Sequence, residues 1–226
     1  MKNRLYCISV GLITAVILAA GALLWTGGTA VIGDIGDASA VWSLGSESAP
    51  VVIDLYPDFN CPVCLEKERY ALQAYSAFQG KIRLICHHYP MQPLSEKVCA
   101  ALEAAGEQGK FWEMHHALIN EDPADIAVVL STAAGRVENL DEFADEYLND
   151  AAESIGLDLD SFQQTLNDES VYEQILEAKQ RAVERGVKTA SLFINGREYV
   201  SGHGTFAEFA ALIEAELERQ GTDAAE

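Results

Sequence analysis

The stretch VVIDLYPDFNCPVC, residues 51–64, indicates both the fold and the chemistry of this chain. Residues 51–56 are mostly apolar and rich in β-branched side chains, which is typical of a buried strand. Residues 65–79 carry apolar side chains at helical spacing, and Gly80 closes that pattern. A strand therefore leads into a helix, and the motif Cys61-Pro62-Val63-Cys64 lies where the two meet.

A Cys-x-x-Cys motif at the start of a helix is typical of thiol–disulfide exchange. Unpaired backbone N–H groups and the helix dipole stabilise a thiolate there, so we expect a lowered pKa for the Cys61 thiol. Pro62 suits the first helical turn because it has no N–H to leave unpaired. Cys64, one turn further on, can form a short disulfide with Cys61. In an exported protein, a substrate thiolate would attack the Cys61 sulfur, and the substrate's second thiol would then release the oxidised product.

Two other roles for the cysteine pair have less support. A structural zinc site needs a second ligand pair, and the adjacent His87-His88 lacks the spacing of a zinc finger. A purely structural disulfide would close too short a loop to stabilise the fold much. We therefore predict redox exchange without a metal or a bound cofactor. Cys86 and Cys99 are expected to be buried free thiols, with a second disulfide between them as the alternative.

The remaining elements predict an α/β fold with a helical insertion. Residues 81–87 form a second strand, and residues 93–186 are largely helical in composition. Asn195-Gly196, between two short strands, is the sequence of a tight hairpin, and a last helix follows. This order gives one small sheet with helices on both faces and a helical block between its two halves. Capping-box patterns open three of the helices: Ser161-x-x-Gln164, Ser170-x-x-Glu173 and Thr205-x-x-Glu208.

The N-terminal residues predict export. Lys2 and Arg4 precede an uncharged run, residues 5–25, which as an apolar helix would span about 30 Å, the thickness of a bilayer core. Its length favours an uncleaved transmembrane anchor, whereas Gly28-Thr29-Ala30 leaves cleavage as a signal peptide open. Either way the rest of the chain faces the extracytoplasmic side of the cell envelope, anchored or, if cleaved, secreted or periplasmic. The predicted organisation is a leader (1–25), a Gly- and Ala-rich linker (26–40), one domain (41–220) and an acidic tail (221–226).

The charge of the chain excludes one class of partner. The sequence has 35 acidic and 15 basic residues, a net charge of −20, and no acidic residue precedes Asp34. Binding to nucleic acid or to an anionic membrane surface needs clustered lysine and arginine. We therefore expect a folded domain, 49% of the chain being hydrophobic, with no nucleic-acid partner.

Four stretches resemble the DsbA-like branch of the thioredoxin superfamily: ESAPVVIDLYPDFNCPVC (47–64), HHYPM (87–91), ALEAAGEQGKFWEMHHALIN (101–120) and SLFINGREYVSGHGTFAEFAALI (191–213). The resemblance implies a thioredoxin fold with a helical insertion, in an exported enzyme that exchanges disulfides with thiols of other exported proteins. It implies that Cys61 is the attacked sulfur and Cys64 the resolving one. It also implies reoxidation by a quinone-linked membrane protein of the DsbB or VKOR kind.

Two departures from the family pattern concern the active site. The family's cis-proline position holds Ala190, within Thr189-Ala190-Ser191. Because a non-proline cis bond costs about 3 kcal/mol, we expect this loop to be trans or strained, which affects its pairing with substrate backbone. The place of the family's buried acid holds Leu55, and Asp54 should point to the opposite face of the strand. Proton transfer for Cys64 then needs another base or water.

The direction of exchange stays open. Val63 cannot add the charge stabilisation that a histidine would give the thiolate, so we expect a less oxidising cysteine pair. A reductase or isomerase is one alternative to an oxidase, and a non-catalytic redox-sensing or client-binding module, suggested by Ala190, is another. The five histidines are expected to be structural or surface residues rather than bases.

Overall fold

The elements follow the predicted order, with one strand added. The structure, a computed structural model, describes residues 41–119, 126–199 and 204–223. In chain order the elements are β1 (Val41–Leu44), β2 (Val51–Tyr56), α2 (Pro62–Ala77), β3 (Ile82–His87), α3 (Pro93–Glu107), α4 (Phe111–Ile119), α5 (Ile126–Ala133), α6 (Leu140–Ser154), α7 (Leu159–Leu166), α8 (Glu169–Glu184), β4 (Ser191–Ile194), β5 (Arg197–Glu198) and α9 (Phe206–Asp223). The short strand β1 has no counterpart among the predicted elements.

Five strands form one mixed sheet in the order β1-β3-β2-β4-β5. β2 and β3 run parallel, with Ile53 opposite Leu84, and α2 makes the crossover connection that a parallel pair requires. The other three pairs are antiparallel. Asn195 and Gly196 join β4 to β5 with φ values of 45° and 74°, as a two-residue hairpin turn of type I′ requires. The predicted hairpin and the predicted α/β class are thus confirmed.

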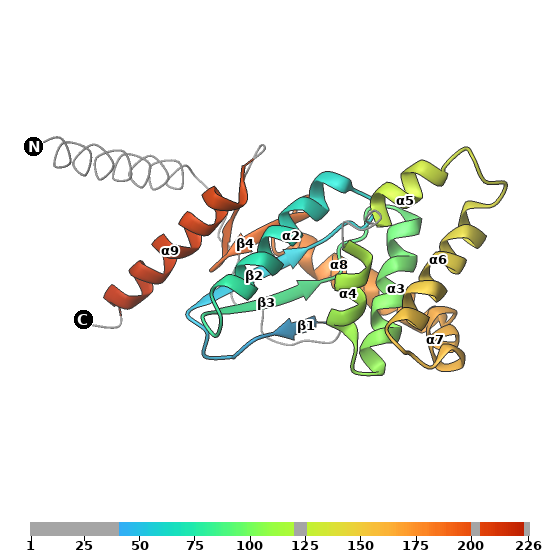
Figure 1. Cartoon of the computed structure of the whole chain (residues 1–226), viewed down its shortest axis with the longest axis horizontal. Helices are drawn as coiled ribbons and strands as arrows, with labels where there is room; N and C mark the ends of the chain where they lie inside the picture. Colours follow the sequence, from blue (N-terminus) through green and yellow to red (C-terminus); the bar gives the residue numbers. More distant parts are fainter. Residues whose placement is uncertain (1–40, 120–125, 200–203, 224–226) are drawn as a thin grey trace, which may run out of the picture.

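Helices cover both faces of the sheet (Figure 1). Val51, Ile53 and Leu55 alternate along β2 and pack against α2 and α9, including Phe209 of α9. Tyr56 faces the other way and packs with Ala182 of α8. This alternation follows from the period of two in a strand. Because α2 begins at Pro62, shortly after β2 ends at Tyr56, the start of α2 lies at this end of the strand.

The helical insertion has a core of its own, centred on α3. α3 packs against α4, α6, α7 and α8, and its buried face is almost entirely small or apolar. In Figure 1 the helices α3 to α7 gather at one end of the sheet, beside the start of α2. The predicted insertion is therefore a single packed block, and α8 at its end also covers one face of the sheet.

Two of the predicted capping boxes are shifted. Asp158 and Asp168 are the N-caps of α7 and α8, and their carboxylates accept hydrogen bonds at 2.8 Å from the N–H groups of Ser161 and Ser170. Each helix thus begins before the serine that was expected to cap it, because an aspartate two or three residues earlier caps it instead. The third box is confirmed: Thr205 N–H donates to Glu208 at 2.7 Å, and Glu208 N–H donates back to the Thr205 hydroxyl at 3.4 Å.

Some predictions fall on residues that are not described. The apolar run at residues 5–25 and the linker at residues 26–40 lie outside the described ranges. Among residues 41–119, 126–199 and 204–223, no helix is both long enough and apolar enough to span a membrane. At the other end, α9 continues to Asp223, so the predicted acidic tail begins inside a helix.

Candidate active site

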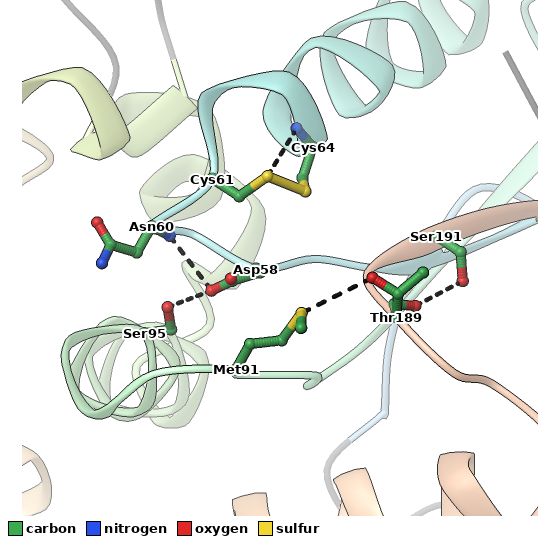
Figure 2. Close-up of a disulfide and its surroundings, with 8 residues drawn as sticks. All are labelled: Asp58, Asn60, Cys61, Cys64, Met91, Ser95, Thr189 and Ser191. Carbon is green, nitrogen blue, oxygen red and sulfur yellow. Dashed lines mark hydrogen bonds between the residues drawn. A yellow bond between two sulfur atoms is a disulfide. The ribbon is translucent and has the colours of Figure 1, made fainter. Parts of the chain in front are cut away.

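Cys61 and Cys64 form a disulfide at the N-terminus of α2 (Figure 2). Their Cα atoms are 5.2 Å apart. Pro62 is the first residue of the helix, as its missing N–H favours. The strand–motif–helix arrangement predicted from the sequence is therefore present, with the two sulfur atoms bonded.

Cys61 is the N-cap of α2, and its sulfur lies at the amide end of the first helical turn. Cys61 Sγ accepts a hydrogen bond from the N–H of Cys64 at 3.3 Å, and the Cys61 carbonyl accepts one from Leu65 N–H at 3.1 Å. Residues 62–65 are Pro, Val, Cys and Leu, so no carboxylate in this turn offsets the positive end of the helix dipole. The geometry favours negative charge on the sulfur of Cys61.

The disulfide is accessible to a second protein. Both cysteines are partly exposed, Pro62 is exposed, and the Val63 side chain is 60% exposed between them. A thiolate from another chain can therefore approach the sulfur of Cys61 without a rearrangement of the fold.

Hydrogen bonds hold the short, largely buried loop that precedes Cys61. Asp58, only 3% exposed, accepts hydrogen bonds from the Ser95 hydroxyl at the start of α3 and from Asn60 N–H (Figure 2). The Asp58 carbonyl also accepts a hydrogen bond from Cys61 N–H at 3.1 Å. The loop that carries the first cysteine is thus tied to the helical insertion.

The segment before β4 lies across from the disulfide. Thr189 is exposed, and its hydroxyl contacts the Met91 sulfur at 3.8 Å, while its carbonyl accepts a hydrogen bond from the Ser191 hydroxyl (Figure 2). Ala190 is buried and lines a small pocket together with Cys64. The structure therefore brings Ala190 to Cys64, 126 residues away in sequence, whereas Thr189 contacts Met91 and is not part of the pocket lining.

Three histidines are bonded through Nε2 to carboxylates: His87 to Asp54 at 3.0 Å, His88 to Glu103 at 2.5 Å and His115 to Glu68 at 2.8 Å. All three imidazole rings are buried. Asp54 pairs with His87, while its neighbour Leu55 packs toward α2, so the two residues point to opposite faces as predicted. His116 is exposed, and His203 lies outside the described residues.

The pair of Glu68 and His115 was missed by sequence reasoning. Glu68 lies four residues after Cys64 on α2 and lines the same pocket, and His115 comes from α4, 47 residues away. The position four residues after a cysteine in a helix is the one sequence signal that could have found Glu68. His115 carries no such signal, since only the tertiary packing of α4 places it.

Cys86 and Cys99 are buried free thiols. Burial raises the pKa of both well above the usual thiol value, and the charges of Glu68 and Glu103 add to the effect. The alternative of a second disulfide between them is not what the structure shows. Among the residues the structure describes, no cluster of three or more His, Cys, Asp or Glu side chains is arranged to hold a metal ion.

Comparisons of sequence give a family and relatives of one kind. A family model described as thioredoxin matches residues 38–215. The chain is 32% identical over 179 residues to a Na⁺/H⁺ antiporter NhaA 1 of Salinispora arenicola, a match that covers 76% of this chain and 24% of that protein. A match to NhaA 3 of Salinispora tropica is 31% identical over 175 residues with the same coverage. The chain thus spans about a quarter of the length of these curated relatives.

Comparisons of structure agree on the fold. α-DsbA1 of Wolbachia pipientis has a TM-score of 0.66 at 19% identity, covering 84% of this chain and 97% of that one. BdbD of Bacillus subtilis, in its oxidised form, has a TM-score of 0.63 at 18% identity, covering 84% and 100%. MdbA of Actinomyces oris, a thiol-disulfide oxidoreductase, has a TM-score of 0.61 at 19% identity, covering 78% and 85%. The helical insertion is included in these overlaps, since most of each chain is covered.

Proposed function

The chain belongs to the thioredoxin family, with the fold of its DsbA-like members, and from this premise we propose a function. We propose that the protein is a thiol–disulfide oxidoreductase that exchanges disulfides with cysteines of exported proteins. One observation carries the proposal, which is the accessible disulfide of Cys61 and Cys64 at the N-terminus of α2. A disulfide placed there has one sulfur that leaves readily as a thiolate.

The exchange needs no cofactor. A client thiolate attacks the Cys61 sulfur, the bond between Cys61 and Cys64 breaks, and Cys64 takes the electron pair and a proton. A second client thiolate then attacks the client sulfur of the mixed disulfide, and Cys61 leaves as a thiolate. The client is oxidised by two electrons and the protein is reduced by two. Run in reverse, the same steps reduce a client disulfide.

The test is alkylation of Cys61 as a function of pH in a Cys64→Ala variant. Stabilisation by the amides of α2 predicts half-maximal reactivity at least about one pH unit below that of an ordinary thiol near 8.5. A titration at about 8.5 would contradict the proposal. Because Cys86 and Cys99 are buried, and with Cys7 replaced by serine in both proteins, the reagent reports on Cys61, and a Cys61→Ala/Cys64→Ala variant gives the background.

The direction of exchange is tested with two clients. An oxidase reoxidises a reduced, unfolded client faster than it reduces insulin, and a reductase or isomerase does the opposite. A Cys61→Ser variant should lose both activities. If the variant kept both activities, Cys61 would not be their source.

Ala190 supports a second candidate, a redox-sensing or client-binding module without turnover. Its segment faces the disulfide, where the family carries a cis-proline that pairs with substrate backbone. Mixed disulfides that accumulate in the wild-type protein, with no oxidised client released, would favour this candidate. Turnover of many clients per protein would exclude it.

We propose an extracytoplasmic location and a membrane partner that reoxidises Cys61 and Cys64, of the quinone-linked DsbB or VKOR kind. Support comes from the basic and apolar N-terminal sequence and from relatives that are named as Na⁺/H⁺ antiporters. The location is tested by fractionating cells that carry the tagged full-length chain. Protease is also added to intact cells from which any outer barrier has been removed. Protection from protease would contradict it.

A further inference from the structure

We infer that Glu68, oriented by His115, accepts the proton of the Cys64 thiol and returns it during exchange. The inference rests on the proposed function and deepens it. The family's acid position holds Leu55, which packs into the apolar core between β2 and α2, so the proton of Cys64 needs a different acceptor. Glu68, which lies on α2 rather than on β2, is that acceptor.

Glu68 is a neighbour of Cys64 on α2. Residues four apart in a helix lie on the same face, with Cβ atoms about 5–6 Å apart. Both side chains line the small pocket beneath the disulfide, together with Ala190. The carboxylate side chain is only 4% exposed. It is thus within reach of the sulfur of Cys64, directly or through one water molecule, and largely shielded from bulk solvent.

His115 fixes the carboxylate and determines where the proton goes. Its Nε2 lies 2.8 Å from Glu68 Oε2, and its ring is fully buried against Phe59, Phe111 and Trp112. Its Nδ1 has no hydrogen-bond partner within the part of the chain that the structure describes. A buried N–H without a partner is costly, so we assign the neutral ring with its proton on Nε2, donated to Glu68. An incoming proton is therefore held by the carboxylate rather than by the imidazole.

The other polar groups around the pocket do not compete for this role. On α2, Lys67 lines the pocket as a cation and cannot accept a proton. On β2, burial and the charge of Asp54 raise the pKa of Tyr56, so its hydroxyl stays protonated. Cys86 of β3 and Cys99 of α3 stay neutral, because burial and the charge of Glu68 raise their pKa.

The nearby carboxylates are already engaged elsewhere. Asp54 lies on the other face of the sheet, bonded to His87, and Asp58 is bonded to the Ser95 hydroxyl. Glu68 is therefore the one carboxylate among the side chains that line this pocket in the described structure.

The proposed step balances without a further reactant. When a client thiolate attacks Cys61, the disulfide breaks and Cys64 leaves with the electron pair. The carboxylic acid of Glu68 gives its proton to this thiolate and becomes a carboxylate bonded to His115. In the reverse step, the carboxylate takes the proton of the Cys64 thiol, the thiolate attacks Cys61, and the client leaves as a thiolate.

The experiment separates the two cysteines by their reaction with 5,5′-dithiobis(2-nitrobenzoate). Cys61 of the reduced protein attacks the reagent and releases one equivalent of coloured thiolate, and Cys64 then resolves the mixed disulfide and releases a second. In a Glu68→Gln variant, whose amide oxygen can still accept the His115 hydrogen bond, we expect the second phase to slow at least about tenfold at pH 7. The first phase should stay within about twofold.

Two variants serve as controls. Glu66→Gln removes the same charge from α2 at a position outside the pocket lining, and it should leave both phases unchanged. With Cys7 replaced by serine in every protein compared, Cys64→Ala should release a single equivalent, which shows that the buried Cys86 and Cys99 do not react.

The sign of the effect distinguishes proton acceptance from simple charge. A carboxylate that acted only through its charge would hold the Cys64 thiol protonated, so its removal would speed up the second phase. An unchanged or faster second phase in Glu68→Gln would overturn the inference. Absence of the first phase in the wild-type protein would instead contradict the proposed function, so the two failures are distinguishable.

The pH dependence of the wild-type protein gives a test that needs no variant to fold. Because the proposed carboxylate removes the proton while the Cys64 sulfur attacks, the reacting state is the thiol beside the carboxylate, and no proton has to be lost to the solvent first. We expect the rate of the second phase to be nearly constant from about pH 6 to pH 8. A tenfold rise per pH unit over this range, as for an isolated thiol, would overturn the inference.

Discussion

At the residue scale, the redox properties of the site depend on what stabilises the thiolate of Cys61. The stabilising groups are backbone amides of α2, since the side chain between the cysteines is the exposed and uncharged Val63. A more stable thiolate means a more stable reduced protein, and hence a stronger oxidant. The identity of residue 63 should therefore shift the equilibrium without disturbing the fold.

Val63→His should make the cysteine pair more oxidising. An imidazolium in the first turn adds charge stabilisation of about 0.3–1 kcal/mol, which corresponds to about a 2- to 5-fold shift in the equilibrium constant with glutathione. Redox titration against glutathione buffers measures it, and Val63→Ala controls for side-chain size. A wild-type protein that is already as oxidising as the histidine variant would show that Val63 does not limit the potential.

The buried thiols of Cys86 and Cys99 predict a loss of stability at alkaline pH. Burial raises the pKa of both in the folded state, whereas an unfolded thiol titrates near 8.5. The stability they provide is complete below the unfolded value. It falls as pH rises above it, by up to about 1.4 kcal/mol per pH unit for each thiol, because only the unfolded chain releases the proton.

Urea unfolding between pH 8 and pH 10 measures this effect. Cys99→Ala should be less stable than wild type at pH 8 but should lose less stability with rising pH. The two slopes should differ by up to about 1.4 kcal/mol per pH unit, the effect of one thiol. Cys61 and Cys64 do not contribute while they remain oxidised. Parallel pH profiles for the two proteins would show that Cys99 titrates alike in the folded and unfolded states.

At the element scale, the hairpin between β4 and β5 depends on Asn195. Its φ of 45° lies in the left-handed region, which asparagine tolerates better than most residues. Its side chain accepts a hydrogen bond from Val52 N–H at 2.7 Å and donates to the Pro50 carbonyl at 3.1 Å and to Glu216 at 2.6 Å. One residue thus joins the hairpin to β2 and to α9.

Asn195→Ala should lower the free energy of unfolding by about 2–4 kcal/mol, because it loses these hydrogen bonds and strains the turn. Asn195→Gly should cost less, about 1–2 kcal/mol, since glycine adopts the same φ and loses only the side-chain bonds. Urea denaturation of the two variants separates the contributions. Equal losses would show that the left-handed conformation is not what selects asparagine here.

The sequence predicts these elements well where the signal is local. The strands predicted at 51–56 and 81–87, the Asn195-Gly196 turn and the Cys-x-x-Cys junction each depend on neighbouring residues, and all are present, the second strand as Ile82–His87. β1 is missed because four residues give too short a pattern, and pairing with β3 stabilises it. The capping serines were misassigned because Asp158 and Asp168 offer a better acceptor just upstream.

The candidate site is predictable only in part, for the same reason. The Cys-x-x-Cys spacing identifies Cys61 and Cys64. The period of two in the strand is enough to place Asp54 on the other side of the sheet. Glu68 of α2 and His115 of α4 are 47 residues apart, and only the tertiary fold brings them together. Tertiary packing decides such pairs, and a single sequence does not contain its geometry.

At the scale of the whole molecule, Trp42 joins the sheet to the helical insertion. It projects from the edge strand β1, stacks on Phe111 of α4 with ring centroids 4.8 Å apart, and donates from Nε1 to Glu103 of α3 at 2.7 Å. Glu103 also bonds His88, next to the end of β3. The same helix α3 carries Ser95, which holds the loop before Cys61, so this junction positions the insertion relative to the active site.

The junction needs a glycine at position 106. A Cβ there would lie 2.3 Å from the Trp42 ring, which is too rigid to move aside. Gly106→Ala should therefore destabilise the protein by about 1–3 kcal/mol through overpacking, although alanine favours a helix over glycine by about 1 kcal/mol. Gly221→Ala in α9 is the matched control, since nothing lies within 4 Å of its Cβ, and it should be neutral or stabilising. Urea unfolding compares the variants, and Trp42→Phe should recover part of the loss in a double-mutant cycle. A Gly106→Ala protein as stable as the Gly221→Ala control would show that the indole ring does not pack against α3 as described.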